Sequence, residues 1–213
     1  MCTNYTPTKH NDWLKDHFGT HLPAGDYPEE SYPGFLAPVV MQSHHSGRVA
    51  CGLARFGLIP IWAKDDKISR HTYNARSETV EEKPSYRNAW RKRQFCIVVA
   101  DNFYEPNYET GKPVRWRIKT KSGYPFGIAS IWEKWIDPKN NEVVASFSMM
   151  TVNADEHPVM RRFHKLDDEK RTPVILQPKD FFRWMGADQI TAKKMMNWQE
   201  MPELEAETAR LIR

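Results

Sequence analysis

The stretch that decides the fold is QFCIVVADNFYEP, residues 94–106. Its first part, residues 94–100, is a continuous apolar run of strand length, which predicts a central strand. The segment 101–106 follows directly and carries Glu105. A carboxylate at the mouth of a buried strand has its pKa raised by desolvation, which suits it to general acid or base chemistry. The competing interpretation is an ordinary solvated loop glutamate.

Strand and helix patterns continue on both sides of this run. Apolar or alternating stretches predict strands at 39–42, 48–56, 114–119, 125–132, 143–152 and 172–176. Helices are expected at 9–18, 85–93, 178–185 and 191–197, with a loop over 22–38 and a hairpin turn at 137–141. Many strands with few helices favour the α+β class, as one domain over residues 1–213 with a largely antiparallel, barrel-like sheet.

The composition of the 213 residues is globular, with 40% hydrophobic and 27% charged residues. The excess of 31 basic over 27 acidic residues gives a net charge of +4, too small to establish a nucleic-acid partner without local clusters. Three cysteines make no disulfide framework and fit a reducing compartment. Without a membrane-length apolar run or a signal-peptide pattern, we expect a cytoplasmic protein with no membrane segment.

Cys2 is the first candidate for chemistry, because removal of Met1 gives it a free α-amine beside its thiol. The amine titrates near about 8 and the thiol near about 8.5, so both are partly nucleophilic at neutral pH. Such an aminothiol condenses with an aldehyde to an imine, which the thiol closes to a thiazolidine. The competing interpretation is an accidental, solvated Cys. Cys51 and Cys96 lie in apolar contexts typical of buried structural thiols.

Asn74 and Arg76 stand in YNARSE, residues 73–78. Asn offers a donor and an acceptor, Arg offers a fork that matches a phosphate, and in a strand the two share one face. A structural strand end, with Arg76 paired to Glu78, is an equal alternative. His164 can shuttle protons near its natural pKa, with His157 as a rival, although a lone His is usually structural.

Basic and aromatic residues interleave at 90–93, 115–117 and 161–162. Together they could line a phosphate-binding face, although such clusters are more often solvated. His44, His45 and Cys51 fit no standard zinc spacing. We therefore expect no metal and no cofactor.

Five motifs follow one another along the chain. The chain begins with MC, which is the first motif. The second, FGLIPIW at 56–62, is similar to Trp-Gly-x-x-Pro-x-Trp, and the third, NARSET at 74–79, matches Asn-Ala-Arg-x-Glu-Thr. The stretch 95–105 is similar to Cys-x-x-Pro-x-x-Gly-Phe-Tyr-Glu-Trp, and 164–176 to His-x-Arg-Met-Pro-Val-Ile-Leu with a longer His-to-Arg spacer. In this order, from an N-terminal Cys, they resemble the SOS-response-associated peptidase (SRAP) family, the abasic-site processing proteins.

The resemblance implies a mixed α+β domain with a distorted β-barrel core that binds single-stranded DNA containing an abasic site. It implies that Cys2, freed of Met1, forms a thiazolidine with the ring-opened sugar. Glu105 then assists proton transfers, including Met1 processing, and His164 assists imine formation or its reversal. The remaining implied contacts lie along the DNA: Asn74 near the sugar, Arg76 and Arg171 on phosphates, Trp62 on bases, and Pro38 on the strand.

This chain departs from the family pattern beside these residues. Thr3 and Asn4 follow Cys2 where the family has Gly and Arg, Phe35 replaces an Asn, and Pro106 replaces a Trp. These changes predict intact chemistry with a weaker or rearranged grip on DNA.

Two other functions remain open from the sequence. One is an N-terminal-nucleophile amidohydrolase, in which the Cys2 thiol attacks an amide and its own amine is the base. The other is a non-catalytic binder of single-stranded nucleic acid that uses Trp and Arg residues alone. We expect a monomer in each case.

Overall fold

The structure is a computed structural model that describes residues 2–43, 45–165 and 167–210. The expectations for Met1 and His44 lie outside the described residues. The strands are β1 (Asn4–Pro7), β2 (Leu36–Gln42), β3 (Val49–Phe56), β4 (Asn74–Arg76), β5 (Phe95–Asn107), β6 (Val114–Thr120), β7 (Phe126–Ile136), β8 (Val143–Asn153), β9 (Arg171–Pro173), β10 (Ile175–Leu176) and β11 (Leu204–Thr208). The helices are α1 (Asn11–Phe18), α2 (Arg87–Arg91), α3 (Phe181–Met185) and α4 (Gln189–Met195), with 3₁₀ turns at Asp66–His71, Met160–Arg162, Pro178–Asp180 and Trp198–Glu200.

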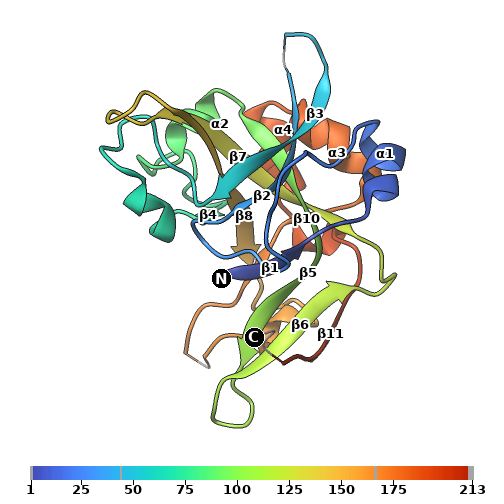
Figure 1. Ribbon diagram of the computed structural model, residues 1–213. Coiled ribbons are helices and arrows are strands. Elements are labelled where there is room, and N and C mark those ends of the chain that lie inside the picture. Colours follow the sequence, from blue (N-terminus) through green and yellow to red (C-terminus); the bar gives the residue numbers. More distant parts are fainter. Residues whose placement is uncertain (1, 44, 166, 211–213) are drawn as a thin grey trace.

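Five strands close into a barrel. The order is β7-β8-β3-β2-β5, and β5 pairs back with β7 to complete the ring. Only the β3–β8 pair within this ring is parallel, so the barrel is mixed and largely antiparallel. Figure 1 shows α1, α3 and α4 grouped at one side, while β6 and β11 extend at the opposite end. This confirms the α+β class with a barrel core.

The apolar run of β5 is continuous because both of its faces are buried. Val98 packs with Val39 of β2 and Phe147 of β8 in the barrel cluster. Its neighbour Ile97 belongs to a second cluster between the outer barrel face and the helices, which includes Trp184 of α3. Alternating side chains of a strand point to opposite faces, so this strand needs apolar residues at every position.

The strand does not end at residue 100, as the sequence pattern indicated. β5 runs on to Asn107, and Glu105 lies inside it with a relative exposure of 2%. The second half is held by β1 on one side, with Asn4 opposite Tyr104, and by β6 on the other. Hydrogen bonds from these two strands stabilise a stretch whose polar residues read as a loop. The alternative of a solvated Glu105 is therefore wrong.

Other element boundaries also differ from the sequence predictions. β1, β4 and β11 were not predicted as separate strands, and β2 begins at Leu36, inside the predicted loop. The helix expected at 85–93 shortens to the five residues of α2. Short strands carry too few residues for a periodic pattern, so only their partners define them.

Burial of the Cys96 thiol links stability to pH. Cys96 is fully buried in β5, and burial raises its pKa well above the ordinary value. A thiol with a raised folded-state pKa stabilises the fold below the unfolded pKa, and this contribution is lost as pH rises above about 8.5. At pH 10 one such thiol lowers the free energy of unfolding by about 2 kcal/mol. Urea denaturation at pH 7 and at pH 10 measures how far the free energy of unfolding falls between the two pH values. In Cys96→Ala this fall should be smaller than in wild type by about 2 kcal/mol. An equal fall in the two proteins would contradict the assignment.

Two kinds of feature are absent from the described residues. None of the helices there has the length and apolar character needed to cross a membrane. No group of three or more His, Cys, Asp or Glu side chains in the same ranges is placed to hold a metal ion.

Candidate active site

Cys2 lies two residues before β1 and is fully buried. Its thiol points to the carbonyl oxygen of Asn4, with an Sγ–O distance of 3.6 Å. Burial raises the pKa of this thiol, and the nearby carboxylate of Glu105 raises it further. The thiol is therefore held in its protonated form at neutral pH.

The pairing of β1 with β5 brings Cys2 to Glu105. Asn4 lies opposite Tyr104, and Tyr5 lies opposite Phe103. Because the pair is antiparallel, the residues before Asn4 run alongside the residues after Tyr104. The unexpected extension of β5 therefore places the predicted nucleophile beside the predicted acid/base group.

Asn74 fixes the main chain of Cys2 from the other side. It begins β4, which pairs in parallel with β8, and its Nδ2 donates to the Cys2 carbonyl oxygen at 2.8 Å. The hydroxyl of Tyr86 donates to the Asn74 carbonyl oxygen at 2.9 Å, a contact that no sequence motif indicated. The side-chain oxygen Oδ1 of Asn74 is buried and accepts no hydrogen bond from the described residues. It is an acceptor available to a ligand hydroxyl next to Cys2.

Glu105 and His164 form a pair. His164 Nε2 lies 3.1 Å from Glu105 Oε2, and the two side chains are 10% and 2% exposed. His164 has a φ of +65°, unusual for a residue with a Cβ. Its backbone N–H donates to the Pro106 carbonyl oxygen at 3.1 Å, which ties this turn to the end of β5. Strained backbone held in this way is typical of functional sites.

His157, the alternative candidate for proton transfer, is hydrogen-bonded to the backbone of the following residues. Its Nδ1 accepts hydrogen bonds from the backbone N–H groups of Val159 and Met160 at 3.1 and 3.2 Å. Burial lowers its pKa, so the neutral acceptor form is favoured. His157 therefore stabilises a turn.

Arg171 is buried and engaged by acidic partners. Its guanidinium binds both carboxylate oxygens of Glu78 at 3.1 and 2.9 Å, Glu169 at 2.7 Å, and the Thr151 carbonyl oxygen at 2.7 Å. Its side chain is 2% exposed. Arg76, by contrast, is half-exposed and pairs with Glu169 at 2.7 Å, so the alternative pairing of Arg76 with Glu78 is wrong. Phosphate contacts by both arginines stay predictions.

Replacing Arg171 should cost stability. Arg171→Met leaves the buried Thr151 carbonyl oxygen without its charged donor, and hydrogen bonds to charged groups contribute about 1.5–3 kcal/mol. We expect the free energy of unfolding, measured in urea, to fall by about that amount. The matched control is Arg76→Met, whose exposed ion pair contributes less than about 1 kcal/mol. Equal losses in the two variants would contradict a structural role for Arg171.

The two remaining predicted DNA contacts differ in exposure. Trp62 is 54% exposed, and its indole N–H donates to the Pro84 carbonyl oxygen at 3.2 Å, so one face is open to stack on a base. Pro38 is buried in β2, opposite Leu53 of β3. Its contact with a strand stays a prediction.

Asn4 stands where the family pattern has an Arg, and an arginine from another strand contacts its side chain. Arg115 of β6 donates from Nη2 to Asn4 Oδ1 at 2.6 Å and pairs with Glu30 at 2.7 Å. Its guanidinium lies 3.4 Å from the ring centroid of Tyr104. In the sequence Arg115 appeared only as part of a dispersed basic cluster, and no local signal indicates this contact across 111 positions. It anchors β1 two residues from Cys2.

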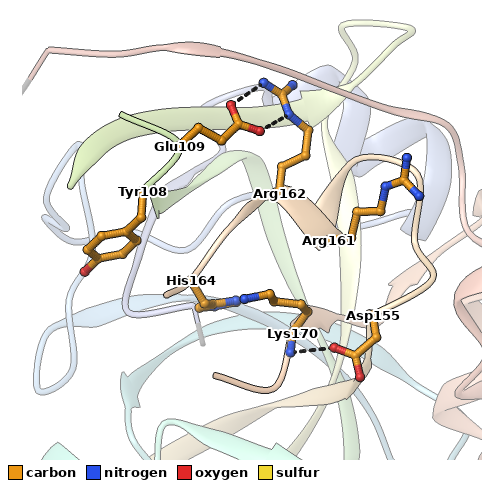
Figure 2. Close-up of a pocket in the computed structure, with 7 residues that line it drawn as sticks. All are labelled: Tyr108, Glu109, Asp155, Arg161, Arg162, His164 and Lys170. Carbon is orange, nitrogen blue, oxygen red and sulfur yellow. Dashed lines mark hydrogen bonds and ion pairs between the residues drawn. The ribbon is translucent and has the colours of Figure 1, made fainter. Parts of the chain in front are cut away.

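A cleft of about 820 Å³ opens beside His164. Figure 2 shows Glu109 and Arg162 joined at one end, Lys170 and Asp155 joined at the other, and Arg161 between them. Its lining residues come from the end of β5 and from the segments around the His164 turn: Tyr108, Glu109, Asp155, Arg161, Arg162, His164 and Lys170. The pair of Glu105 and His164 therefore borders an open space.

Comparison with known proteins agrees with the motif order. The family model described as SOS response associated peptidase (SRAP) matches residues 1–211. The chain is 32% identical over 195 residues to the abasic site processing protein YoqW of Bacillus subtilis (strain 168), covering 87% of this chain and 80% of YoqW. It is 29% identical over 217 residues to the abasic site processing protein HMCES of Gallus gallus, covering 87% of this chain and 60% of that protein.

Solved structures share this architecture. An X-ray structure of a protein from Bordetella bronchiseptica has a TM-score of 0.87 at 29% identity, covering 99% of this chain and all of the other (100%). One from Bacteroides thetaiotaomicron has a TM-score of 0.77 at 19% identity, covering 98% and 92%, and shares the fold. Since the family match runs through almost the whole chain, the family predicted from the motifs is confirmed, and this protein belongs to the SOS response associated peptidase (SRAP) family.

Proposed function

We propose that this protein processes abasic sites in single-stranded DNA by forming a covalent thiazolidine through Cys2 after Met1 has been removed. The observation that carries the proposal is the meeting of four residues from distant parts of the chain. Asn74 holds the Cys2 carbonyl oxygen at 2.8 Å, and the Glu105 carboxylate raises the pKa of the Cys2 thiol and lies 3.1 Å from His164. The names of the relatives, abasic site processing proteins, support the same substrate.

The covalent step needs two bonds to carbon. The Cys2 amine adds to the sugar aldehyde and water leaves, which gives an imine. The thiol then adds across the C=N bond, so that sulfur bonds to carbon and the thiol proton ends on nitrogen. No oxidant or reductant is required. The protonated state of the buried thiol provides the proton that this closure places on nitrogen.

Glu105 and His164 act before the amine attacks. An abasic sugar is mostly a closed hemiacetal, so its C1 hydroxyl must lose a proton while the ring oxygen gains one. Two adjacent titratable groups, 3.1 Å apart and largely buried, can take and return that proton. The buried Oδ1 of Asn74 accepts a hydrogen bond from a sugar hydroxyl in this proposal.

The same groups suit two associated reactions. Strand cleavage, which is lyase chemistry, starts from the imine: a base removes the proton on the carbon next to the imine carbon, a C=C bond forms and the phosphate on the 3′ side leaves. Glu105, the carboxylate that acts on the Cys2 thiol, is the proposed base. Hydrolysis of the bond between Met1 and Cys2, which is peptidase chemistry, requires a base to activate water at the same place. Phosphate contacts by Arg76 and Arg171, stacking by Trp62 and a strand contact at Pro38 belong to the proposal as well.

The test is incubation with a single-stranded oligonucleotide that carries one abasic site. We expect an adduct that survives denaturing electrophoresis, and none with the undamaged oligonucleotide. An amidohydrolase or a non-covalent binder gives no such adduct. Its absence from a preparation whose mass shows Met1 removed would overturn the proposal.

A further inference from the structure

The cleft beside His164 suits a negatively charged chain, and this inference rests on the proposed function. Its volume, about 820 Å³, lies within the roughly 300–1,000 Å³ of pockets that hold small ligands. His164 lines the cleft and is also the partner of Glu105. The cleft therefore adjoins the pair to which the proposed function assigns the proton transfer.

Arg161 is an exposed arginine in the wall of this cleft. The carboxylate of Glu109 is bound by Arg162 at 2.9 and 3.0 Å. The carboxylate of Asp155 accepts from Asn153 Nδ2 at 2.8 Å and from the Lys170 backbone N–H at 3.0 Å. Both acidic groups are thus engaged, and among the described residues none forms an ion pair with the exposed Arg161.

We propose that the single strand on one side of the abasic nucleotide lies in this cleft, with a phosphate on Arg161 between the two engaged pairs. The arginine fork matches phosphate geometry. Tyr108, half-buried on the opposite wall, offers a ring on which a base stacks without sequence preference. The turn that holds His164 at a positive φ also holds Arg161, so binding of the strand and placement of the proton-transfer pair share one segment.

Crosslinking rates with truncated strands test this placement. Three oligonucleotides are compared under single-turnover conditions: both arms long, the 5′ arm cut to one nucleotide, and the 3′ arm cut to one nucleotide. With both arms, Arg161→Ala should slow capture by up to about fivefold, the effect of one exposed charge contact. One truncation should abolish the difference between wild type and Arg161→Ala, and the other should leave it unchanged.

Two matched variants accompany Arg161→Ala. Arg161→Lys keeps the charge and should retain most of the rate. Arg48→Ala removes an exposed arginine from the β2–β3 hairpin, at the far end of the molecule from β6, and should match wild type with every strand. Rates that respond equally to Arg48→Ala and Arg161→Ala, or an Arg161 effect that survives both truncations, overturn the placement.

Non-covalent binding keeps this inference separate from the proposed function. Fluorescence anisotropy with undamaged single strands should show weaker binding of Arg161→Ala and a salt dependence lower by about 0.7 in slope, the value for one phosphate contact. If wild type forms no adduct but this difference is present, the proposed chemistry fails and the cleft stands. If wild type forms the adduct and Arg161→Ala matches it in both assays, the cleft inference alone fails.

Discussion

Cys2→Ala is expected to abolish the denaturation-resistant adduct with abasic DNA, while non-covalent binding of single strands stays largely intact. The thiol closes the thiazolidine, whereas an amine alone forms only an imine that water hydrolyses. The groups proposed to grip the strand, Arg76 and Trp62, are exposed and belong to other elements. Denaturing electrophoresis measures the adduct, and anisotropy measures binding.

The matched control for this variant is Cys96→Ala. Cys96 lies in the barrel cluster with Cys2 but belongs to the start of β5, between β2 and β7. It should crosslink at the wild-type rate. A stable adduct of unchanged yield from Cys2→Ala contradicts the thiazolidine, and loss of the adduct in both variants assigns the effect to the core.

Glu105→Gln is expected to slow capture of an abasic site by about 10²–10⁴-fold, the range of general acid–base assistance. The substitution keeps size and hydrogen-bonding capacity at a position that is 2% exposed, so the fold should survive. Ring opening of the sugar loses its proton-transfer group, whereas the Cys2 aminothiol remains. Single-turnover crosslinking measures the rate.

A small open-chain aldehyde separates the two steps in the Glu105→Gln test. Because this aldehyde needs no ring opening, its reaction with Cys2 should be nearly unchanged. His164 lies 3.1 Å from Glu105 and is able to share the proton transfer, so the double variant with His164→Gln gives the upper limit of the effect. Capture of the abasic site by Glu105→Gln at the wild-type rate, with Met1 shown absent by mass, would exclude Glu105 as the acid/base group.

The central strand could be predicted from the sequence because burial on both faces leaves a local signal. Residues 95–100 are apolar at every position. The continuation to Asn107 leaves none, because Asp101 and Asn102 are polar and only the partners β1 and β6 hold the chain extended. The β1–β5 pairing joins residues more than 90 positions apart and is a tertiary property, so the burial of Glu105 could not be predicted from its neighbours.

In the candidate site, the sequence likewise indicated the residues but not the contacts that position them. The chemistry of an aminothiol made Cys2 a candidate, and the motif order favoured it and indicated Asn74, Glu105 and His164 as its companions. The contacts that position them were not visible: the hydroxyl of Tyr86 on Asn74, and Arg115 on Asn4. Each joins residues of separate elements through a single hydrogen bond, which no spacing rule encodes.

The most direct test of the account is peptide mapping of the purified adduct by mass spectrometry, with and without borohydride. We expect the modification to lie on a peptide that begins with Cys2 and lacks Met1. Its mass should equal peptide plus abasic strand minus one water, and borohydride should leave it unchanged because a thiazolidine has no C=N bond. A modification on a lysine, a peptide that retains Met1, or a gain of two hydrogens on reduction would contradict it.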